Sequence, residues 1–276
     1  MARRLLAADI DLTVWNRTPS RSAQLASEGA RLAESPTHLA ADSSVVITML
    51  ADANAVIAVL VDGGVLDALP PGAVVIDMST IGPRAAQHLS NQAAARKVEF
   101  LDAPVSGSVS SAENGELLTL VGGDKDVLAA VRPILAAMTR DQAYLGTSGA
   151  GAAMKLALNI VIGLTNQAAC ECLALAEQYG VDREAAYAVL ETSAVGSPFL
   201  HYKRSAYLEP ERTEPAFTVE LMQKDLDLAV ALGREANVPL PATAVAAEVL
   251  TIARRLGHGA RDMTRVLDAL RARAAR

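Results

Sequence analysis

Hydrophobic and polar positions in the first half of the chain predict short strands separated by helices. Apolar runs occur at residues 12–15, 45–50, 74–78, 100–105 and 117–121. Stretches with helical periodicity fill most of the gaps, including residues 83–96 and 125–138. Such alternation is typical of a mostly parallel sheet with crossover helices.

The second half has a different pattern, because helical periodicity continues from Gly149 to the end. It runs through residues 150–179, 183–192, 218–236, 243–256 and 261–273. The change falls at residues 146–151, where glycines cluster. We therefore predict an α/β domain over residues 1–148, with a Rossmann-like, mostly parallel sheet, followed by an all-helical domain over residues 149–276.

The first apolar run leads into the turn Asn16-Arg17-Thr18-Pro19. Thr18 and Pro19 suit the N-cap and the first position of a helix. In a dinucleotide-binding fold, a strand that ends in this way is the second one, where the adenosine ribose is bound. Residues 1–11 contain no glycine and have the periodicity of a helix. The first strand and the Gly-rich phosphate loop of such a fold are thus missing from the pattern.

Composition excludes several classes of function. The chain has 276 residues, 51% of them hydrophobic, and a net charge of −6, which argues against a nucleic-acid partner. No apolar run approaches the roughly 20 residues of a membrane helix, and Asp9 and Asp11 interrupt any secretory signal. Cys170 and Cys172 fit buried apolar positions better than a metal or disulfide pair. We expect a cytoplasmic protein without a metal site.

Candidate catalytic chemistry lies in the first helix of the second half. Residues 152–164 are apolar almost all round, which predicts a buried helix. Lys155 and Asn159 are one turn apart on one face of it, and an unpaired lysine there would be costly. A lysine shielded from water can act as an acid and a base in catalysis.

Polar residues also follow two other predicted strands or lie in a later helix. Ser106 and Gly107 could present a hydroxyl and backbone N–H groups to a carboxylate. Thr80 ends the segment Asp77-Met78-Ser79-Thr80, and Lys224-Asp225 lies within a long helix. The carboxyl edge of an α/β sheet is where ligands bind.

Taken in order, these motifs resemble the β-hydroxyacid dehydrogenase family, which includes the 3-hydroxyisobutyrate dehydrogenases and the glyoxylate/succinic semialdehyde reductases. The carriers of the resemblance span the chain, in the order Val14-Trp15-Asn16-Arg17-Thr18, Asp77-Met78-Ser79-Thr80, Asp102-Ala103-Pro104-Val105-Ser106-Gly107, Gly151-Ala152-Ala153-Met154-Lys155-Leu156-Ala157-Leu158-Asn159 and Lys224-Asp225-Leu226. Each motif alone is weak, but five in the right order are specific.

The resemblance implies reversible oxidation of a small hydroxyacid with NADP or NAD. It implies Lys155 as the catalytic acid and base, with Asn159 beside it contacting the substrate, and Ser106 and Gly107 as carboxylate binders. It places Thr80 and Lys224 near the nicotinamide and lines the cofactor groove with two further residues, Leu50 and Ala51.

Two departures from the family pattern stand out. Ser108 replaces a second glycine in the substrate loop, and its side chain is expected to narrow the pocket. Met1 also corresponds to the middle of the family's first helix, so about 20 residues of strand and loop would be missing. We expect a start further upstream rather than a true truncation, because Lys155, Ser106 and Arg17 are retained.

Residues of the first turn predict the cofactor. NAD-preferring folds place Asp or Glu at the end of the second strand, whereas this chain has Asn16 and Arg17 there. Arg17 offers a positive fork to a 2′-phosphate, and the Thr18 hydroxyl can add to it. NADP is the expected cofactor, with NAD as the alternative.

Other functions remain open. An imine reductase shares the architecture but typically lacks the lysine, and a 6-phosphogluconate dehydrogenase needs a longer, more basic chain. A truncated, cofactor-impaired protein with a scaffold role is an alternative from another class. A non-enzymatic relative, such as the nucleosome-associated dehydrogenase-like domains, is a further one, but those tend to lose the lysine.

The helical half predicts a homodimer or homotetramer. Helix 150–175 is too apolar for a surface helix, and a domain of about 125 residues buries only some two-thirds of its chain surface alone. The expected covering residues are Leu221, Leu228, Leu232, Val238, Leu240, Val245, Val249 and Ile252. The remaining surface is expected to pack against a second copy.

Overall fold

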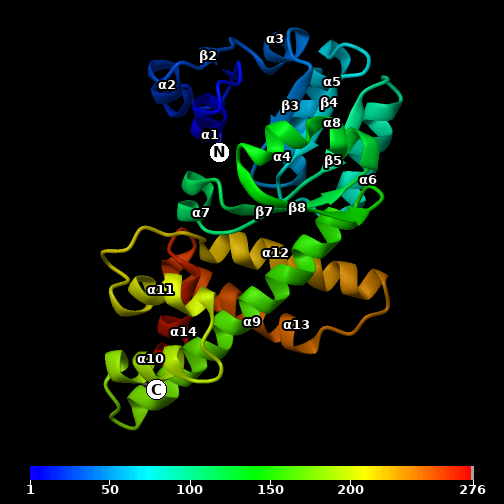
Figure 1. Ribbon diagram of the computed structural model, residues 1–276. Helices are drawn as coiled ribbons and strands as arrows, with labels where there is room; N and C mark the ends of the chain where they lie inside the picture. Colours follow the sequence, from blue (N-terminus) through cyan, green and yellow to red (C-terminus); the bar gives the residue numbers. More distant parts are fainter. Residues whose placement is uncertain (275–276) are drawn as a thin grey trace. The chain divides into compact units, whose positions relative to one another are not determined.

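The chain folds into two compact units, Met1–Lys155 and Leu156–Arg276 (Figure 1). The computed structural model describes residues 1–274, with side chains up to Arg271. The boundary between the units lies inside one long helix, α9 (Ala150–Gln178). The α/β architecture followed by a helical unit confirms the fold class predicted from the pattern.

The first unit is built on parallel strands. Its strands are β1 (Thr13–Val14), β2 (Arg31–Leu32), β3 (Val45–Thr48), β4 (Val74–Asp77), β5 (Glu99–Asp102), β6 (Val105–Ser106), β7 (Leu117–Gly122) and β8 (Thr139–Gly146). The larger sheet has the order β3-β4-β5-β7-β6, with β8 also paired to β7. β3, β4 and β5 are mutually parallel, β7 runs antiparallel to β5 and β6, and β8 is parallel to β7.

Helices alternate with the strands of this unit, and several of them pack on one face or the other of the larger sheet. The helices are α1 (Ala2–Ala7), α2 (Ser20–Ser27), α3 (Pro36–Ala41), α4 (Ala53–Ile57), α5 (Val65–Ala68), α6 (Pro83–Ala94), α7 (Val109–Asn114) and α8 (Lys125–Ala136). Val75 points into a core formed with α3, α4, α5 and α6, whereas Ile76 points into a second core formed with α1 and α8. All four residues of β4 are buried, as expected of a central parallel strand.

The sheet is divided at one place. β1 pairs with β2 in a separate two-stranded sheet, and β3 is an end strand of the larger sheet. Among residues 1–274, no strand is hydrogen-bonded between β1 and β3. α1 stands at the start of the described chain as a short helix, in agreement with the periodicity of residues 1–11.

The second unit is helical. It continues α9 with α10 (Arg183–Thr192), α11 (Pro198–Leu208), α12 (Val219–Glu235), α13 (Pro241–Ala253) and α14 (Val266–Ala274). The helix expected over residues 243–256 begins two residues earlier, at Pro241, and passes into a π-helical turn at Arg254–His258. The helix expected over residues 261–273 opens with a 3-10 turn, Met263–Arg265, before α14.

The core of the helical unit uses other residues than expected. From α12 and α13 it takes Val219, Met222, Leu226, Ala246, Ala247, Leu250 and Ala253. Leu221, Val238 and Val245 are exposed, so their prediction as covering residues was wrong, although Val249 and Ile252 pack at the core edge. The buried face of α12 and of α13 is therefore rotated from the predicted one, toward Val219, Met222 and Leu226 in α12 and toward Ala246, Leu250 and Ala253 in α13.

Two further expectations about α9 need correction. Cys172 is exposed, and only Cys170 is a buried apolar residue; both are free thiols. By length and composition α9 also qualifies as a possible membrane span, although 44% of its most apolar 18-residue window is buried inside the protein. Asn166 of α9 donates to the Met263 carbonyl at 3.1 Å and accepts from the Tyr207 hydroxyl at 2.7 Å. Asn166 thereby joins α9 to α11 and to the 3-10 turn before α14.

Candidate active site

Three polar side chains lie in one row at the carboxyl ends of neighbouring parallel strands. Thr48 of β3 pairs in register with Asp77 of β4, which pairs with Asp102 of β5. Residues in register point to the same face of a sheet, so the three side chains are neighbours. All three are buried. Both carboxylates belong to segments singled out in the sequence, but no role was predicted for either.

Asp77 ties the ends of β3 and β4 together. Its Oδ1 accepts hydrogen bonds from the Thr48 hydroxyl at 2.6 Å and from the Ser79 hydroxyl at 2.7 Å. The Ser79 hydroxyl in turn accepts from the Leu50 N–H at 2.8 Å. This network fixes the backbone of Leu50, next to Ala51, and that of Ser79, next to Thr80. The three predicted cofactor residues therefore lie on segments joined through one buried carboxylate.

Burial raises the pKa of Asp77 from 3.8 to about 6, against the lowering effect of its hydrogen bonds to Thr48 and Ser79. Between pH 4 and 6 the folded protein thus binds a proton that the unfolded chain has lost. The contribution of Asp77 to stability accordingly falls as pH rises through this window, by about 3 kcal/mol in total.

We expect Asp77→Asn to remove this pH dependence. Urea unfolding followed by fluorescence of Trp15, the only tryptophan, reports on the α/β unit. The free energy of unfolding of the wild type, relative to the variant, should decrease between pH 4 and 6. Asp124→Asn, at an exposed helix cap, serves as the control. Parallel pH curves for the wild type and Asp77→Asn would contradict this assignment.

The predicted carboxylate-binding loop leaves the sheet at β6. Ser106 ends that strand, and Gly107 follows with φ +144°. A Cβ on Gly107 would lie 2.7 Å from a methyl of Leu117, so only glycine fits. The Ser108 hydroxyl caps α7 by accepting from the Ser111 N–H at 3.1 Å. The Ser108 side chain is therefore the N-cap of α7, and its expected effect on the pocket stays a prediction.

The predicted ribose-binding turn lies between β1 and α2. The Asn16 carboxamide oxygen accepts from the Thr18 N–H at 2.9 Å and thereby bends the chain. Thr18 was expected to cap α2, but the helix begins at Ser20 without a side-chain cap, so this expectation was wrong. Asn16, Arg17 and Thr18 are exposed, and Arg17 is accessible to a ligand.

Lys155 lies six residues into α9 and is half-buried. The helix starts at the carboxyl edge of the sheet, where Asp102 accepts from the N–H groups of Gly149 and Ala152 at 2.7 and 2.8 Å. Asp102 is also four residues before Ser106 in the chain. The end of β5 therefore both anchors the lysine helix and leads into the Ser106-Gly107 loop.

Asn159 and Lys224 belong to the helical unit and share a carboxylate. The Asn159 amide nitrogen donates to Asp225 at 2.5 Å, and both residues are almost fully buried. The Lys224 ammonium lies 2.9 Å from the other oxygen of Asp225. Asp225 thus holds two of the predicted site residues, a connection that spacing could not reveal because 66 residues separate Asn159 from Asp225.

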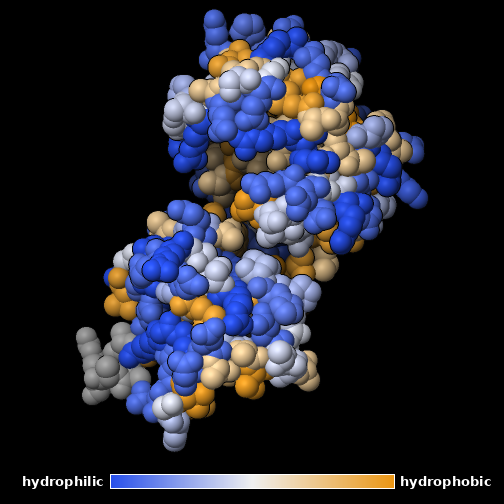
Figure 2. Space-filling view, turned by 60° about the vertical axis from the view of Figure 1, so that its left-hand side comes forward, coloured by the Kyte–Doolittle hydropathy of each residue, from blue (hydrophilic) through white to orange (hydrophobic). Residues whose placement is uncertain are grey.

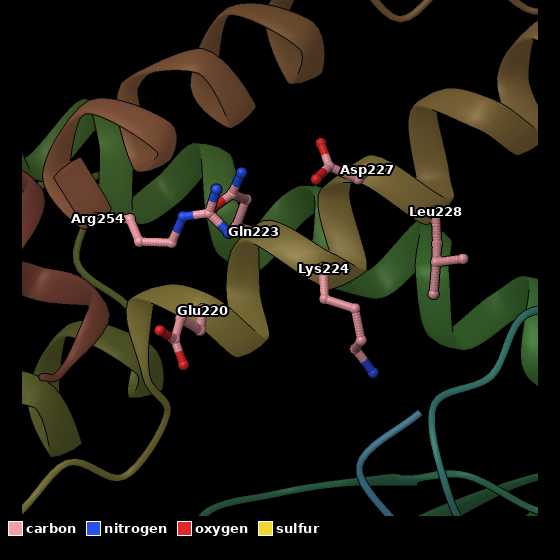
Figure 3. A pocket seen from close by; sticks show the side chains of 6 residues that line it. All are labelled: Glu220, Gln223, Lys224, Asp227, Leu228 and Arg254. Atoms are coloured by element: carbon pink, nitrogen blue, oxygen red, sulfur yellow. The ribbon is translucent and has the colours of Figure 1, made fainter. Parts of the chain in front are cut away.

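A cavity of about 380 Å³ lies beside Lys224 in the helical unit. It is lined by Glu220, Gln223, Lys224, Asp227, Leu228 and Arg254. In Figure 3 the Lys224 side chain projects from α12 away from Arg254, which belongs to the π-helical turn that follows α13. No group of three or more potential metal ligands occurs in the part of the chain that the structure describes.

Comparison with known proteins gives the class of this chain. Residues 1–146 match the NAD-binding domain of 6-phosphogluconate dehydrogenase. Residues 149–270 match the NAD-binding domain of NADP-dependent 3-hydroxyisobutyrate dehydrogenase. The chain is 35% identical to glyoxylate/succinic semialdehyde reductase 1 of Arabidopsis thaliana, over 98% of this chain and 94% of the relative. It is 31% identical to 2-(hydroxymethyl)glutarate dehydrogenase of Eubacterium barkeri, over 97% and 89%.

A solved structure shows the same fold. The 3-hydroxyisobutyrate dehydrogenase of Salmonella typhimurium superimposes with a TM-score of 0.90 at 28% identity, covering 97% of this chain and 94% of the other. The matches define an NAD(P)-dependent oxidoreductase. More narrowly, the chain belongs to the β-hydroxyacid dehydrogenase family and is a dehydrogenase of the 3-hydroxyacid class.

Proposed function

We propose that this enzyme interconverts a small β-hydroxyacid and its semialdehyde or keto acid, with NADP as the preferred cofactor. The observation that carries the proposal is the half-buried Lys155 on a helix anchored at the carboxyl edge of the sheet, from which the Ser106-Gly107 loop also departs. An assay of aldehyde- and keto-acids of three to six carbons with NADPH tests it. Absence of turnover on every acid, with NADPH bound, would count against it.

The residues present fit a nicotinamide dinucleotide at several points. Arg17, exposed after β1, would contact the 2′-phosphate, with Asn16 and Thr18 shaping that turn. Leu50 and Ala51 would line the groove, with the Leu50 N–H already held by Ser79. Thr80 and Lys224 would lie near the nicotinamide. When bound, the reduced cofactor supplies the hydride.

The remaining chemistry falls to side chains of this enzyme. The Ser106 hydroxyl and the Gly107 N–H would bind the substrate carboxylate and orient the carbonyl group. The Lys155 ammonium would donate its proton to the carbonyl oxygen as negative charge develops there, and would take it back in the oxidative direction. The Asn159 amide nitrogen donates to Asp225, and its carbonyl oxygen would accept a hydrogen bond from the substrate.

Arg17→Asp is expected to weaken NADPH far more than NADH. The change replaces a charge-assisted contact to the 2′-phosphate with repulsion, and one such contact is worth about 1.5–3 kcal/mol, or roughly 10- to 100-fold in Kd. Titration of both cofactors, followed by nicotinamide fluorescence, measures the ratio. Arg21→Asp, four residues further along in α2, is a matched control for the general loss of positive charge. Equal losses of affinity for NADPH and NADH in Arg17→Asp would show that Arg17 does not recognise the 2′-phosphate.

A scaffold role with impaired cofactor binding is a second candidate. It is favoured by the division of the sheet, since β1 and β3 each have one edge without a strand partner among the described residues. Backbone groups of such an edge must be satisfied by water or by another segment. Direct titration with NADPH separates the two candidates: micromolar binding supports the enzyme, and no binding supports the scaffold.

We also propose a homo-oligomer, at least a dimer, formed through α9. Val161, Ala168 and Leu175 recur every seven residues on this helix and are exposed, as is Tyr179. These residues form an exposed apolar stripe along one face of a helix whose other faces are largely buried, and removal of such a stripe from water favours association with a second copy. Figure 2 shows hydrophobic residues at the surface among hydrophilic ones on the face that it presents.

Light scattering should give a mass of at least twice 28.8 kDa at micromolar concentration. The double variant Val161→Glu/Leu175→Glu should be monomeric, because it places negative charges on the proposed contact face of α9. Val109→Glu, at an exposed position of α7, should not change the mass. A wild type of 28.8 kDa would overturn the proposal.

A further inference from the structure

The helix that carries Lys155 begins without a side-chain cap of its own. The Gly149 carbonyl accepts the first helical hydrogen bond, from the Ala153 N–H at 2.9 Å, so Gly149 holds the N-cap position. An N-cap side chain normally accepts hydrogen bonds from the N–H groups of the first turn, and glycine has none to offer. A helix of 29 residues therefore needs another acceptor at its start.

Asp102 supplies that acceptor from the end of β5. One carboxylate oxygen accepts from the Gly149 N–H at 2.7 Å, and the other accepts from the Ala152 N–H at 2.8 Å. These are the two N–H groups that a capping box satisfies within one segment. Here a single side chain satisfies both from 47 and 50 residues earlier in the chain.

The surrounding backbone leaves room for this carboxylate and little more. A Cβ on Gly122 would lie 2.7 and 2.8 Å from its two oxygens. A Cβ on Gly151 would lie 3.0 Å from one of them and 2.2 Å from the Leu120 carbonyl oxygen. Asp102 itself is 1% exposed. Burial raises the pKa of Asp102, while the N–H groups of Gly149 and Ala152 act in the opposite direction and favour the carboxylate.

We infer that Asp102 is a positioning residue for Lys155, because its two hydrogen bonds to the first turn fix the start and rotation of α9. Lys155 follows Ala152 by three residues, or nearly one helical turn, so a shift of that turn moves the lysine directly. The inference rests on the proposed role of Lys155 as acid and base. The buried Asp102 carboxylate thereby determines the position of the Lys155 ammonium during proton transfer.

Asp102→Asn tests the inference with minimal change in shape. The new NH₂ group faces a backbone N–H, so one of the two hydrogen bonds is lost. We expect kcat to fall by about 10- to 100-fold, as for misplacement of a catalytic group by a fraction of an ångström to an ångström. KM for the acid and Kd for NADPH should stay near the wild-type values, because the residues proposed to bind the acid and the cofactor are others.

A matched control separates positioning from general stability. Asp124 caps α8 in the same unit, where its Oδ1 accepts from the Asp126 and Val127 N–H groups at 2.7 and 3.1 Å. That helix carries none of the proposed site residues. Asp124→Asn should therefore leave kcat unchanged, even where its loss of unfolding free energy equals that of Asp102→Asn.

A readout independent of turnover completes the test. The rate at which an amine-acylating reagent modifies Lys155, followed by peptide mass spectrometry, should change in Asp102→Asn and stay constant in Asp124→Asn. Gly122→Ala, which intrudes on the carboxylate, should change the rate in the same way if Asp102→Asn is poorly folded.

The outcomes distinguish this inference from the proposed function. A wild-type kcat and labelling rate in Asp102→Asn, while Lys155→Ala is inactive, would overturn the positioning role alone. Equal effects of Asp102→Asn and Asp124→Asn would overturn it as well. An active Lys155→Ala would instead overturn the proposed function.

Discussion

Lys155→Ala is expected to lower kcat by about 10²- to 10⁴-fold, the range typical for loss of a positioned acid and base. The proton that Lys155 would donate to the carbonyl oxygen must then come from a water molecule. At this half-buried position no ammonium group would hold a proton toward that oxygen. Kd for NADPH should change little, since the cofactor groove is assigned to other residues. Stopped-flow measurement of NADPH oxidation and a separate binding titration give the two quantities.

A control and a graded variant sharpen this expectation. Lys125→Ala removes an exposed lysine from the start of α8 and should leave kcat unchanged. Lys155→Met keeps the aliphatic length without the ammonium, so it should be as inactive as Lys155→Ala if the proton matters and not the packing. Wild-type turnover in Lys155→Ala with NADPH bound would exclude the mechanism.

Elements with strong local signals were predictable from the sequence. The apolar run over residues 74–78 gave β4 (Val74–Asp77), and the helix expected over residues 183–192 is α10 with the same bounds. Both have an unambiguous pattern: a continuous buried strand in one case, and a regular 3.6-residue period in the other. Their conformation is set within their own segment.

Elements with weak or unused signals were missed. β8 (Thr139–Gly146) is largely exposed and polar, so no apolar run marks it. α11 (Pro198–Leu208) has a signal, since Ser197 caps it and Pro198 stands at its first position, but hydrophobic periodicity is poor there. The antiparallel direction of β7 depends on its pairing with β5, which no local pattern encodes.

The candidate site likewise has features that the sequence predicts and features that only the fold determines. Its residue types and their order were readable from the sequence, and with them the family. The buried carboxylates that hold the site together were not readable in their roles, because each acts across a long separation: Asp102 on Gly149, and Asp225 on Asn159. An aspartate at the end of a strand or in a helix has several possible partners, and only the fold selects one.

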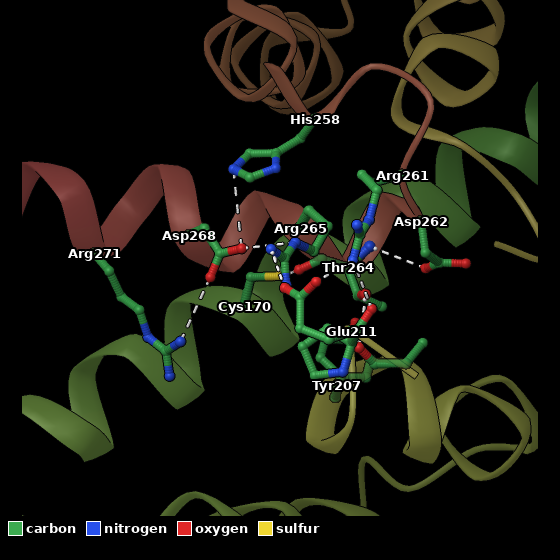
Figure 4. Close-up of polar contacts among 12 residues, drawn as sticks. Cys170, Tyr207, Glu211, His258, Arg261, Asp262, Thr264, Arg265, Asp268 and Arg271 are labelled. Carbon is green, nitrogen blue, oxygen red and sulfur yellow. Dashed lines mark hydrogen bonds and ion pairs between the residues drawn. The ribbon is translucent and has the colours of Figure 1, made fainter. Parts of the chain in front are cut away.

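The second large effect is expected at a buried ion pair in the helical unit. The Lys203 ammonium, on α11, donates to Asp262 at 2.5 Å, and both side chains are almost fully buried. Asp262 also accepts from the N–H groups of Ala216 at 3.1 Å and Thr264 at 3.1 Å. Figure 4 shows Asp262 among the polar contacts around the 3-10 turn Met263–Arg265. The pair thus joins α11 to the segments before α12 and before α14.

Burial lowers the pKa of Lys203, whereas the charge and hydrogen bond of Asp262 oppose that shift. Lys203→Met keeps the aliphatic length and leaves the Asp262 carboxylate buried without its counter-charge. Removal of one partner from a buried pair costs about 3–5 kcal/mol of unfolding free energy. Urea unfolding measured by far-UV circular dichroism should show this loss, while fluorescence of Trp15 follows the α/β unit separately.

Two comparisons make the expectation specific. Arg212→Met removes one partner of an exposed pair, with Glu209 at 3.8 Å, and should cost no more than about 1 kcal/mol. Lys203→Met combined with Asp262→Asn should cost less than the sum of the single changes, because the second substitution removes the buried unpaired charge. A Lys203→Met variant within about 1 kcal/mol of the wild type, which is the range of an exposed pair, would show that backbone N–H groups alone hold the Asp262 carboxylate.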